Sequence, residues 1–190
     1  MDASERCRPF SRRMHPWEIE EARRVFRDRL DYDRVRIHEC SPWPNRIDGI
    51  GRWLKRMPQT GHANAITLGN HCIFPVRLPD HPVSPQDFEH YLICWLIHEL
   101  THAWQYQQMG WRYLLKALSA QFKDRGAAYD FGGEEGLKQR RAANATIHSF
   151  NLEQQGDIAR TYYQRLCLGK DVSAFIPYIE DIHSDHIRRA

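Results

Sequence analysis

The sequence predicts a single, mostly helical α+β domain whose small β-sheet lies at the edge and packs on one helix. The length of 190 residues suits one domain with a core of its own. Hydrophobic residues make up 42% and charged residues 27%, as is usual in a soluble globular protein. Helical signals extend over the long segments, whereas only short segments alternate as strands do, so helices are expected to take most of the chain.

The predicted domain covers residues 1–190 and has three parts. Residues 1–60 form an N-terminal extension of helix and strand, and residues 61–170 form the core that carries the candidate site. Residues 171–190 form a C-terminal tail. No internal repeat or low-complexity segment divides the chain further.

The first half of the chain contains the predicted strands. Residues 1–15 look like a loose leader, and Pro16 is well suited to the first position of a helix. Gly69-Asn70 reverses the Asn-Gly order that hairpins favour, so it predicts a hairpin less strongly. The expected elements are a helix over 17–30, a strand over 33–40, a short helix over 46–58 and two short strands within 64–75.

The second half is expected to be almost entirely helical. Ser84 can cap a helix that starts at Pro85 and ends before Gly110. The glycine-rich stretch 124–136 predicts a loop beside the site. The expected elements are helices over 85–109, 111–123 and 142–169, and one short helix within the tail.

Charge, hydropathy and cysteines limit the classes of function and location. The formal net charge is only +3, and acidic residues interleave with the arginines of residues 1–36, so no nucleic-acid partner is expected. No apolar run reaches the ~18 residues of a membrane span, and the N-terminal residues lack the apolar stretch of a secretory signal. The five scattered cysteines form no CxxC pair, which predicts neither a disulfide framework nor a thiolate metal site. We expect synthesis in the reducing cytoplasm, and export by a route without a signal peptide is left open.

The stretch IHELTHAWQ, residues 97–105, contains an HExxH motif. On a helix, His98 and His102 share one face, so both imidazoles can bind one metal ion. Glu99 lies about 100° further round, where a general base would accept a proton from water. The preceding residues, YLICWLI, are apolar, so the helix is predicted to be buried. The alternative is a chance motif whose histidines bond to carbonyl groups, but a buried helix has little reason to carry such groups.

A catalytic zinc site needs a third protein ligand, and the segment NLEQQGDIA supplies a candidate. Glu153 and Asp157 are four residues apart on a helix with an apolar side. Glu153 can complete the metal shell, while Asp157 can accept a hydrogen bond from the ring N–H of His98. The alternative is a pair of solvated carboxylates on a surface helix. Other candidates for the third ligand are Glu134, Glu135 and His148.

The HELTH motif followed by E-x-x-x-D on a later helix resembles the gluzincin branch of the zincin metallopeptidases. The compact length and the phrases LIHELTHAWQYQ and FNLEQQGDIARTYY are similar to small bacterial minimal gluzincins, some of which are associated with Rhs-type secretion systems. The resemblance covers about residues 64–168 and implies a zincin-like domain that hydrolyses peptide bonds with Zn²⁺ as its cofactor. The gap between His102 and Glu153 is longer than in thermolysin, and a helix and the glycine-rich loop fill it.

The resemblance also implies a role for each residue of the site. His98, His102 and Glu153 would ligate zinc, Glu99 would be the general base, and Asp157 would support His98. The strand within 64–75 would pair with an extended substrate. The alternative is a strand that only covers the helix.

A zincin usually needs a donor besides the metal for the negative charge that develops on the carbonyl oxygen. Tyr129 and His148 are the candidates, and Tyr106 is a weaker one. For each, a packed aromatic ring or a capped surface histidine is the alternative.

Two other functions share the same ligands. A zinc amidase acting on a non-protein amide would differ only in the walls of its cleft. A degenerate zinc-binding scaffold, acting as a partner in a bacterial secretion system, would keep the ligands and lose turnover. Glu99 argues against a scaffold, because a structural site has no use for a base. We therefore expect a zinc metallopeptidase with a peptide or protein substrate, and a secretion-system or toxin protein is the other partner considered.

Overall fold

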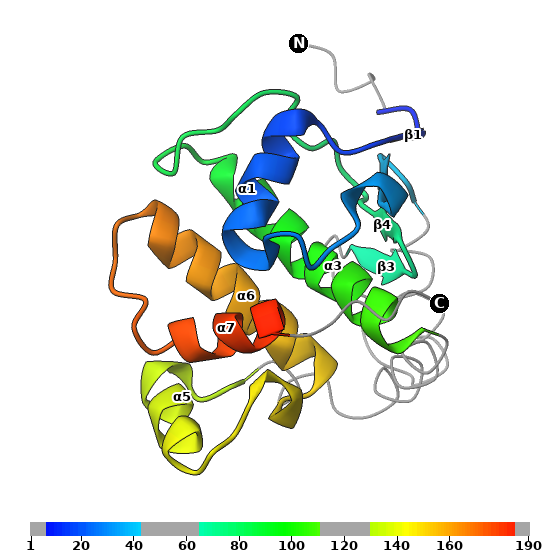
Figure 1. Cartoon of the computed structure of the whole chain (residues 1–190). Coiled ribbons are helices and arrows are strands. Elements are labelled where there is room, and N and C mark those ends of the chain that lie inside the picture. The colour runs from blue at the N-terminus through cyan, green and yellow to red at the C-terminus, as the bar shows by residue number, and fades with distance from the viewer. Residues whose placement is uncertain (1–6, 43–64, 111–129, 185–190) are drawn as a thin grey trace, which may run out of the picture.

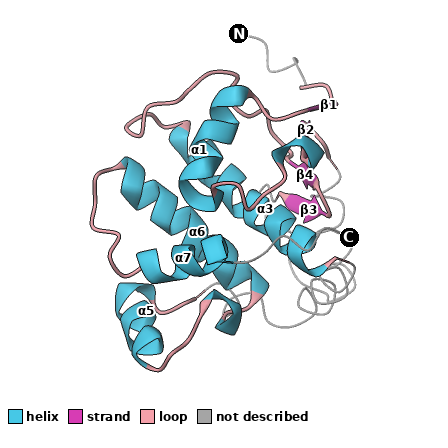
Figure 2. Cartoon of the chain, in the orientation of Figure 1, coloured by secondary structure: helices cyan, strands magenta, loops and turns pink. Residues whose placement is uncertain are grey.

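The computed structural model describes residues 7–42, 65–110 and 130–184 of the chain (Figure 1). Within these residues, five α-helices and a four-stranded sheet make up the fold, so the predicted α+β class is confirmed. Figure 2 shows that helices dominate and that the strands gather on one side. None of the described helices is long and apolar enough to cross a membrane. The helices expected over 46–58 and 111–123 lie outside the described residues.

The sheet has the strand order β1-β2-β4-β3. Its strands are β1 (Phe10–Arg12), β2 (Arg36–Glu39), β3 (Ile66–Leu68) and β4 (His71–Ile73). β2 pairs antiparallel with β1 and parallel with β4, and β3 pairs antiparallel with β4. The prediction of a loose leader over residues 1–15 was therefore wrong for Phe10–Arg12. Their partner strand lies 27 positions further along the chain, a distance that local patterns do not reveal.

The hairpin between β3 and β4 is closed by the two residues Gly69 and Asn70. Gly69 has a φ of +64°, whereas Asn70 does not have a positive φ. A positive φ at the first central residue alone is the type II′ turn, which favours glycine at that position. The reversed Gly-Asn order is therefore the one that this turn requires. The ring of Tyr106 lies beside it, 3.4 Å from where a Cβ on Gly69 would be.

Helix α3 (His90–Met109) carries the HExxH motif and passes through the middle of the molecule (Figure 1). β3 and β4 contact it on one side and helix α6 (Leu152–Cys167) contacts it on the other. Helix α1 (Pro16–Phe26) contacts both α3 and α6. The motif helix is therefore buried by the sheet and by two helices, as its apolar sequence predicted.

α3 begins at His90, five residues later than predicted. Ser84 and Asp87 form a separate turn instead, in which the backbone N–H of Asp87 donates to the carbonyl oxygen of Ser84 at 2.9 Å. The Asp87 carboxylate accepts in return from the backbone N–H of Ser84 at 3.2 Å. These contacts are typical of a helix start, but here they close a single turn.

The long helix predicted over 142–169 is broken into separate elements. The described elements in this part of the chain are α5 (Gly133–Ala142), the 3-10 turn η2 (Ile147–Ser149), α6 and α7 (Ile176–Ser184). Asn144 has a φ of +60°, which ends the first helix, and Asn151 caps the next one. α5 also occupies part of the stretch that was predicted as a loop. The short helix predicted in the tail is present as α7.

The core lies among α1, α3, α6, α7 and the inner face of the sheet. A second 3-10 turn, η1 (Tyr32–Arg34), leads from α1 into β2. The largest fully buried side chains are Trp104, Tyr163, Tyr178, Phe26, Phe74 and Phe175. Aromatic rings thus fill much of the space between the helices.

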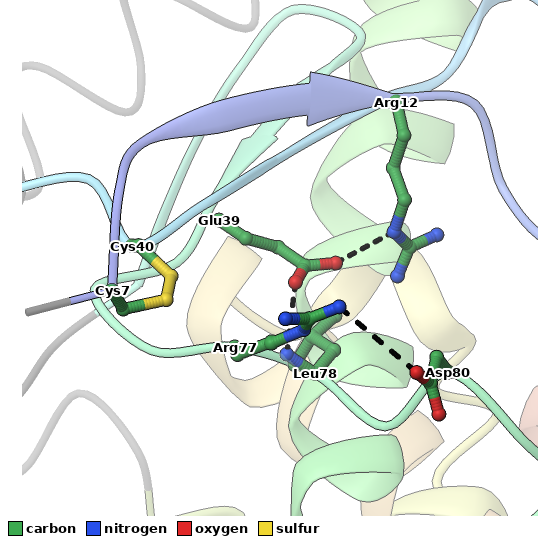
Figure 3. The surroundings of a disulfide bond; sticks show 7 residues. All are labelled: Cys7, Arg12, Glu39, Cys40, Arg77, Leu78 and Asp80. Carbon is green, nitrogen blue, oxygen red and sulfur yellow. Dashed lines mark hydrogen bonds and ion pairs between the residues drawn. A yellow bond between two sulfur atoms is a disulfide. The ribbon is translucent and has the colours of Figure 1, made fainter. Parts of the chain in front are cut away.

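A disulfide and a buried ion cluster fasten β1 to the rest of the fold. Figure 3 shows the disulfide and the contact between Arg12 and Glu39. Cys7 and Cys40 form the disulfide, with their Cα atoms 5.4 Å apart. The sequence predicted no disulfide, and this was wrong for this pair, because the β1–β2 pairing that joins them was not foreseen. The guanidinium group of Arg12 donates to Glu39 at 2.6 Å and to both carboxylate oxygens of Glu18 at 2.7 and 2.8 Å. Both carboxylates are buried, so Arg12 neutralises two charges inside the protein.

Candidate metal centre

Helices α3 and α6 together supply the candidate metal centre. His98, Glu99 and His102 lie on α3, and all three side chains are buried. Glu153 lies in the first turn of α6 and is half-buried. The start of α6 is fixed by Asn151, whose side chain accepts from the backbone N–H of Gln154 at 2.8 Å. The Gln154 side chain accepts in return from the backbone N–H of Asn151, which completes a capping box.

Three potential ligand atoms converge between the two helices. The Nε2 atoms of His98 and His102 are 3.2 Å apart. The Oε2 atom of Glu153 lies 3.4 Å from the first and 3.7 Å from the second. Ligands about 2.0–2.1 Å from a tetrahedral ion are roughly 3.3–3.4 Å from one another. The three residues can therefore hold a metal ion on one face and leave its opposite side open.

The ring of His98 is oriented by Asp157, one turn after Glu153 on α6. The Nδ1–H of His98 donates to the Oδ1 atom of Asp157 at 3.0 Å. The same oxygen lies 3.0 Å from the guanidinium group of Arg160, which keeps the carboxylate in place. With its proton on Nδ1, His98 presents the lone pair of Nε2 to the ion.

The ring of His102 is oriented by Gln105, three residues later on the same helix. The side-chain amide of Gln105 donates to the carbonyl oxygen of Leu152 at 3.0 Å and to the Oε1 atom of Gln155 at 2.9 Å. Because a carbonyl only accepts, these contacts turn the Gln105 oxygen towards Nδ1 of His102, 2.9 Å away. The proton of His102 therefore sits on Nδ1, and its Nε2 lone pair also faces the ion position.

Gly156 allows α6 to approach this closely. A Cβ atom at this position would lie 2.7–3.0 Å from three atoms of the His98 ring. Such contacts are shorter than packed carbon atoms tolerate. Only glycine lets the His98 ring lie flat against the backbone of α6 while Glu153 and Asp157 reach it from either side.

The charges in the metal-free site favour a cation between the ligands. Burial lowers the pKa of His98, but hydrogen bonds to Asp157 and Glu153 outweigh it and raise that pKa to about 9. Burial also opposes a charge on His102, but Glu153 overcomes this and raises the pKa of His102. For Glu153, burial would raise the pKa, and the two histidines instead hold it well below its usual range. The protons that the site attracts occupy the place of a metal ion.

The Glu99 side chain extends from α3 towards the sheet. Its Oε2 atom accepts a hydrogen bond from the hydroxyl of Thr67 in β3 at 2.7 Å. Both side chains are buried, with exposed fractions of 4% for Glu99 and 5% for Thr67. Glu99 directly follows the candidate ligand His98 in the sequence, and the hydrogen bond from Thr67 holds its carboxylate in one orientation.

The other residues predicted as a third ligand or as a charge-stabilising donor are not part of this cluster within the described residues. Glu134 pairs with Arg165 at 2.7 Å, and Glu135 accepts from Gln139 within α5, so neither is among the three converging residues. His148 is exposed and stacks on Trp104 of α3, with ring centroids 6.2 Å apart. Tyr129 lies outside the described residues. The roles of His148 and Tyr129 as charge-stabilising donors remain predictions.

Three residues of the site were not singled out from the sequence: Gln105, Gly156 and Thr67. Gln105 stands three residues after His102, a spacing that puts both on one helix face and could have pointed to it. Gly156 is a glycine inside a helix, which costs stability and usually has a packing reason. Thr67 gives no local signal, because its contact with Glu99 spans 32 positions.

Comparison with models of protein families finds no match, and no solved structure matches the chain. Among curated proteins, the chain is 30% identical over 150 residues to the type VI secretion system spike protein VgrG2b of Pseudomonas aeruginosa (strain PAO1). The match covers 77% of this chain but only 12% of the length of the spike protein. The chain is thus similar to one segment of a much longer secretion-system protein.

Proposed function

We propose that the chain is a zinc-dependent metallopeptidase that hydrolyses peptide bonds. The observation that carries the proposal is the convergence of His98, His102 and Glu153 on one point, beside the buried carboxylate of Glu99. Two imidazole nitrogens and one carboxylate oxygen form a donor set typical of catalytic zinc, which keeps a position open. Structural zinc sites usually take four protein ligands, and the described residues supply three.

Each residue then has a defined task. His98, His102 and Glu153 would hold the ion, and Asp157 and Gln105 would fix the two imidazole rings through their Nδ1–H groups. A bound zinc ion would supply Lewis-acid polarisation of the scissile carbonyl group. Glu99 would accept the proton of the attacking water and return it to the leaving amine.

Strand β3 would bind the substrate. Among the described strands it is the last in the sheet, and it contacts the motif helix α3. An extended peptide can add to such an edge through backbone hydrogen bonds. This arrangement would hold a peptide bond beside Glu99. A strand edge pairs with a peptide backbone, so it favours a peptide substrate over a non-protein amide.

The test compares the wild type with Glu99→Gln, in metal content and in hydrolysis of a broad peptide library. The wild type should bind about one zinc ion per chain and cleave peptides. Glu99→Gln should bind zinc as well and lose activity by several orders of magnitude, because the amide cannot accept the proton. Glu153→Ala should lose zinc, and the matched variant Glu134→Ala, whose carboxylate pairs with Arg165, should retain it.

The other functions predict different outcomes. A zinc-loaded wild type that cleaves no peptide would favour the scaffold, and one that cleaves only non-protein amides would favour the amidase. A wild type without zinc at saturating concentrations would contradict all three.

The chain is further proposed to act with a bacterial type VI secretion system. The similarity to one segment of a type VI spike protein supports this context. The Cys7–Cys40 disulfide supports a destination more oxidising than the cytoplasm in which the chain would be made. In the native host, an epitope-tagged chain should leave the cell only while the secretion system is intact. Equal export after the system is disabled would contradict the proposal.

A further inference from the structure

Thr67 joins the general base to the edge of the sheet. Its hydroxyl oxygen lies 2.7 Å from the Oε2 atom of Glu99 and 3.2 Å from the backbone carbonyl oxygen of the same residue. A hydroxyl has one proton to donate, and the shorter contact gives that proton to the carboxylate. Hydrogen bonds to a charged acceptor are shorter and stronger than those between neutral groups. The contact therefore gives the buried Oε2 atom a hydrogen-bond donor and also restrains the Glu99 side chain.

The side chain of Thr67 stands out from the sheet, whereas its backbone N–H and carbonyl group lie in the plane of the sheet and point towards the edge of β3 that no other described strand covers. The backbone N–H of Arg36 donates to Asn70, and that of Phe74 donates to His38. In β4, the even-numbered residues therefore direct their backbone groups to β2, and His71 and Ile73 direct theirs to β3. Those two residues pair with Leu68 and Ile66. Thr67, which lies opposite Cys72, must direct its own N–H and carbonyl group away from β4.

No other described strand pairs with β3, so this donor and acceptor stand at the free edge. The same residue thus offers its backbone to an incoming strand and its side chain to Glu99. An extended ligand that pairs with the edge would fix the backbone of Thr67. Because a threonine side chain has one rotatable bond before its hydroxyl, fixing the backbone also fixes the position of that hydroxyl.

We propose that Thr67 is a positioning residue that holds the Glu99 carboxylate in register with a peptide paired along β3. The inference rests on the proposed function and adds a residue to it. Donation to Oε2 leaves Oε1 of Glu99 to receive the proton from water. A carboxylate without this restraint would sample other rotamers, and its oxygen would be misplaced during proton transfer.

The proposal predicts a particular separation of the kinetic constants. Thr67→Val keeps the branched shape and the backbone groups at the edge but removes the hydroxyl. It should therefore leave KM and the zinc content unchanged and lower kcat about tenfold, the scale of one lost hydrogen bond to a charged group. Thr67→Ser restores the hydroxyl and should recover kcat to within about threefold of the wild type.

Thr101→Val is the matched control. Thr101 is a fully buried threonine of α3 whose hydroxyl donates to the carbonyl oxygen of Ile97 at 3.0 Å. Thr101→Val shows how much kcat changes when a buried threonine hydroxyl that does not bond to Glu99 is removed near the motif. Its kcat should stay within about twofold of the wild type.

A double-mutant cycle checks the contact without any activity. Thr67→Val and Glu99→Ala are made singly and together, and the unfolding equilibrium constant of each zinc-loaded protein is measured. The change in the unfolding equilibrium constant of the double variant should differ from the product of the two single changes by about five- to tenfold, because the two side chains interact. Independent effects would overturn the proposal.

The outcomes separate the two proposals. An active wild type with an unchanged kcat in Thr67→Val would overturn the positioning role and leave the peptidase standing. A loss of zinc in Thr67→Val would also overturn it, because the residue would then be structural. A wild type that binds zinc and cleaves nothing would overturn both, even if the cycle showed coupling.

Discussion

At the scale of single residues, Asp157 is the group on which the orientation of His98 depends. Removing the carboxylate in Asp157→Ala should weaken zinc binding about 10–100-fold, because His98 loses the acceptor that fixes its ring and its proton. Asp157→Asn keeps an oxygen that can accept from Nδ1–H and should lose less. Titration against a competing chelator measures both affinities. Equal affinities for the wild type and Asp157→Ala would show that His98 needs no such support.

The ionisation of the ligands makes the stability of the metal-free protein depend on pH. The pKa of His98 rises from 6.5 to about 9 on folding, so its protonated form stabilises the fold below pH 6.5. This contribution is lost as the pH rises through 9, and it amounts to about 3 kcal/mol at most. The contribution of Glu153 to stability has the opposite pH dependence. Its pKa falls below 4.5 on folding, so the contribution is present above pH 4.5 and lost in acid.

The metal-free protein should therefore be most stable between about pH 4.5 and 6.5 and should weaken towards pH 9. Urea unfolding across this range, with a chelator present, measures the loss. Zinc loading should abolish the loss at alkaline pH, since the ion replaces the protons. A metal-free protein as stable at pH 9 as at pH 6 would contradict the assigned charges.

The three candidate ligands and Asp157, which the structure brings together, could be found from sequence because each belongs to a local pattern, as does Glu99, whose role as a base stays a prediction. His98, Glu99 and His102 lie within one HExxH, and Glu153 and Asp157 lie one turn apart. Helical periodicity is a local property, so it places such residues without knowledge of the fold. The partners Thr67 and Gln155 could not be found in this way, because they reach the motif from 32 and 50 positions away.

At the scale of elements, the contact between α3 and α6 depends on Gly156. Gly156→Ala should favour the helix itself by up to about 1 kcal/mol, because alanine is the better helix former. The added Cβ would nevertheless displace the His98 ring, so zinc affinity should fall at least about 100-fold. The variant should thus fold and bind zinc poorly. Calorimetric zinc titration and urea unfolding measure the two effects separately.

Gln164→Ala is the control for Gly156→Ala, since Gln164 is exposed on the same helix. Its zinc affinity should match that of the wild type. If Gly156→Ala also bound zinc as the wild type does, the close approach of the helices would not be needed for the site.

Element boundaries were less predictable than element types. Ser84 and Asp87 have the chemistry of a helix start, but the helix begins at His90 because those two residues close a turn of their own. The helix predicted from 142 ignored the Asn151 and Gln154 pair, which is a recognisable capping box. The first error needs the three-dimensional structure to correct, and the second could have been avoided.

At the scale of the whole molecule, the buried ion cluster of Arg12 joins β1, α1 and β2. Arg12→Met should lower the free energy of unfolding by about 3–5 kcal/mol, because Glu18 and Glu39 would remain buried without their partner. Arg23→Met is the control: Arg23 pairs with Asp28 at 3.6 Å between exposed side chains and should cost less than about 1 kcal/mol. Urea unfolding of both variants measures the difference. Equal decreases in the free energy of unfolding would show that burial does not determine how much these ion pairs contribute to stability.

The disulfide and a metal ion bound at the candidate site would be two long-range cross-links that respond to different chemistry. The disulfide joins positions 33 residues apart in the strand region, and a reducing agent opens it. A zinc ion held by α3 and α6 would be a second cross-link, across helices whose paired residues His98 and Asp157 are 59 positions apart. A chelator would open that one and leave the disulfide intact. The disulfide and the contact between α3 and α6 could therefore be loosened one at a time, by a phosphine reductant, which does not take up zinc as a thiol reductant does, and by a chelator.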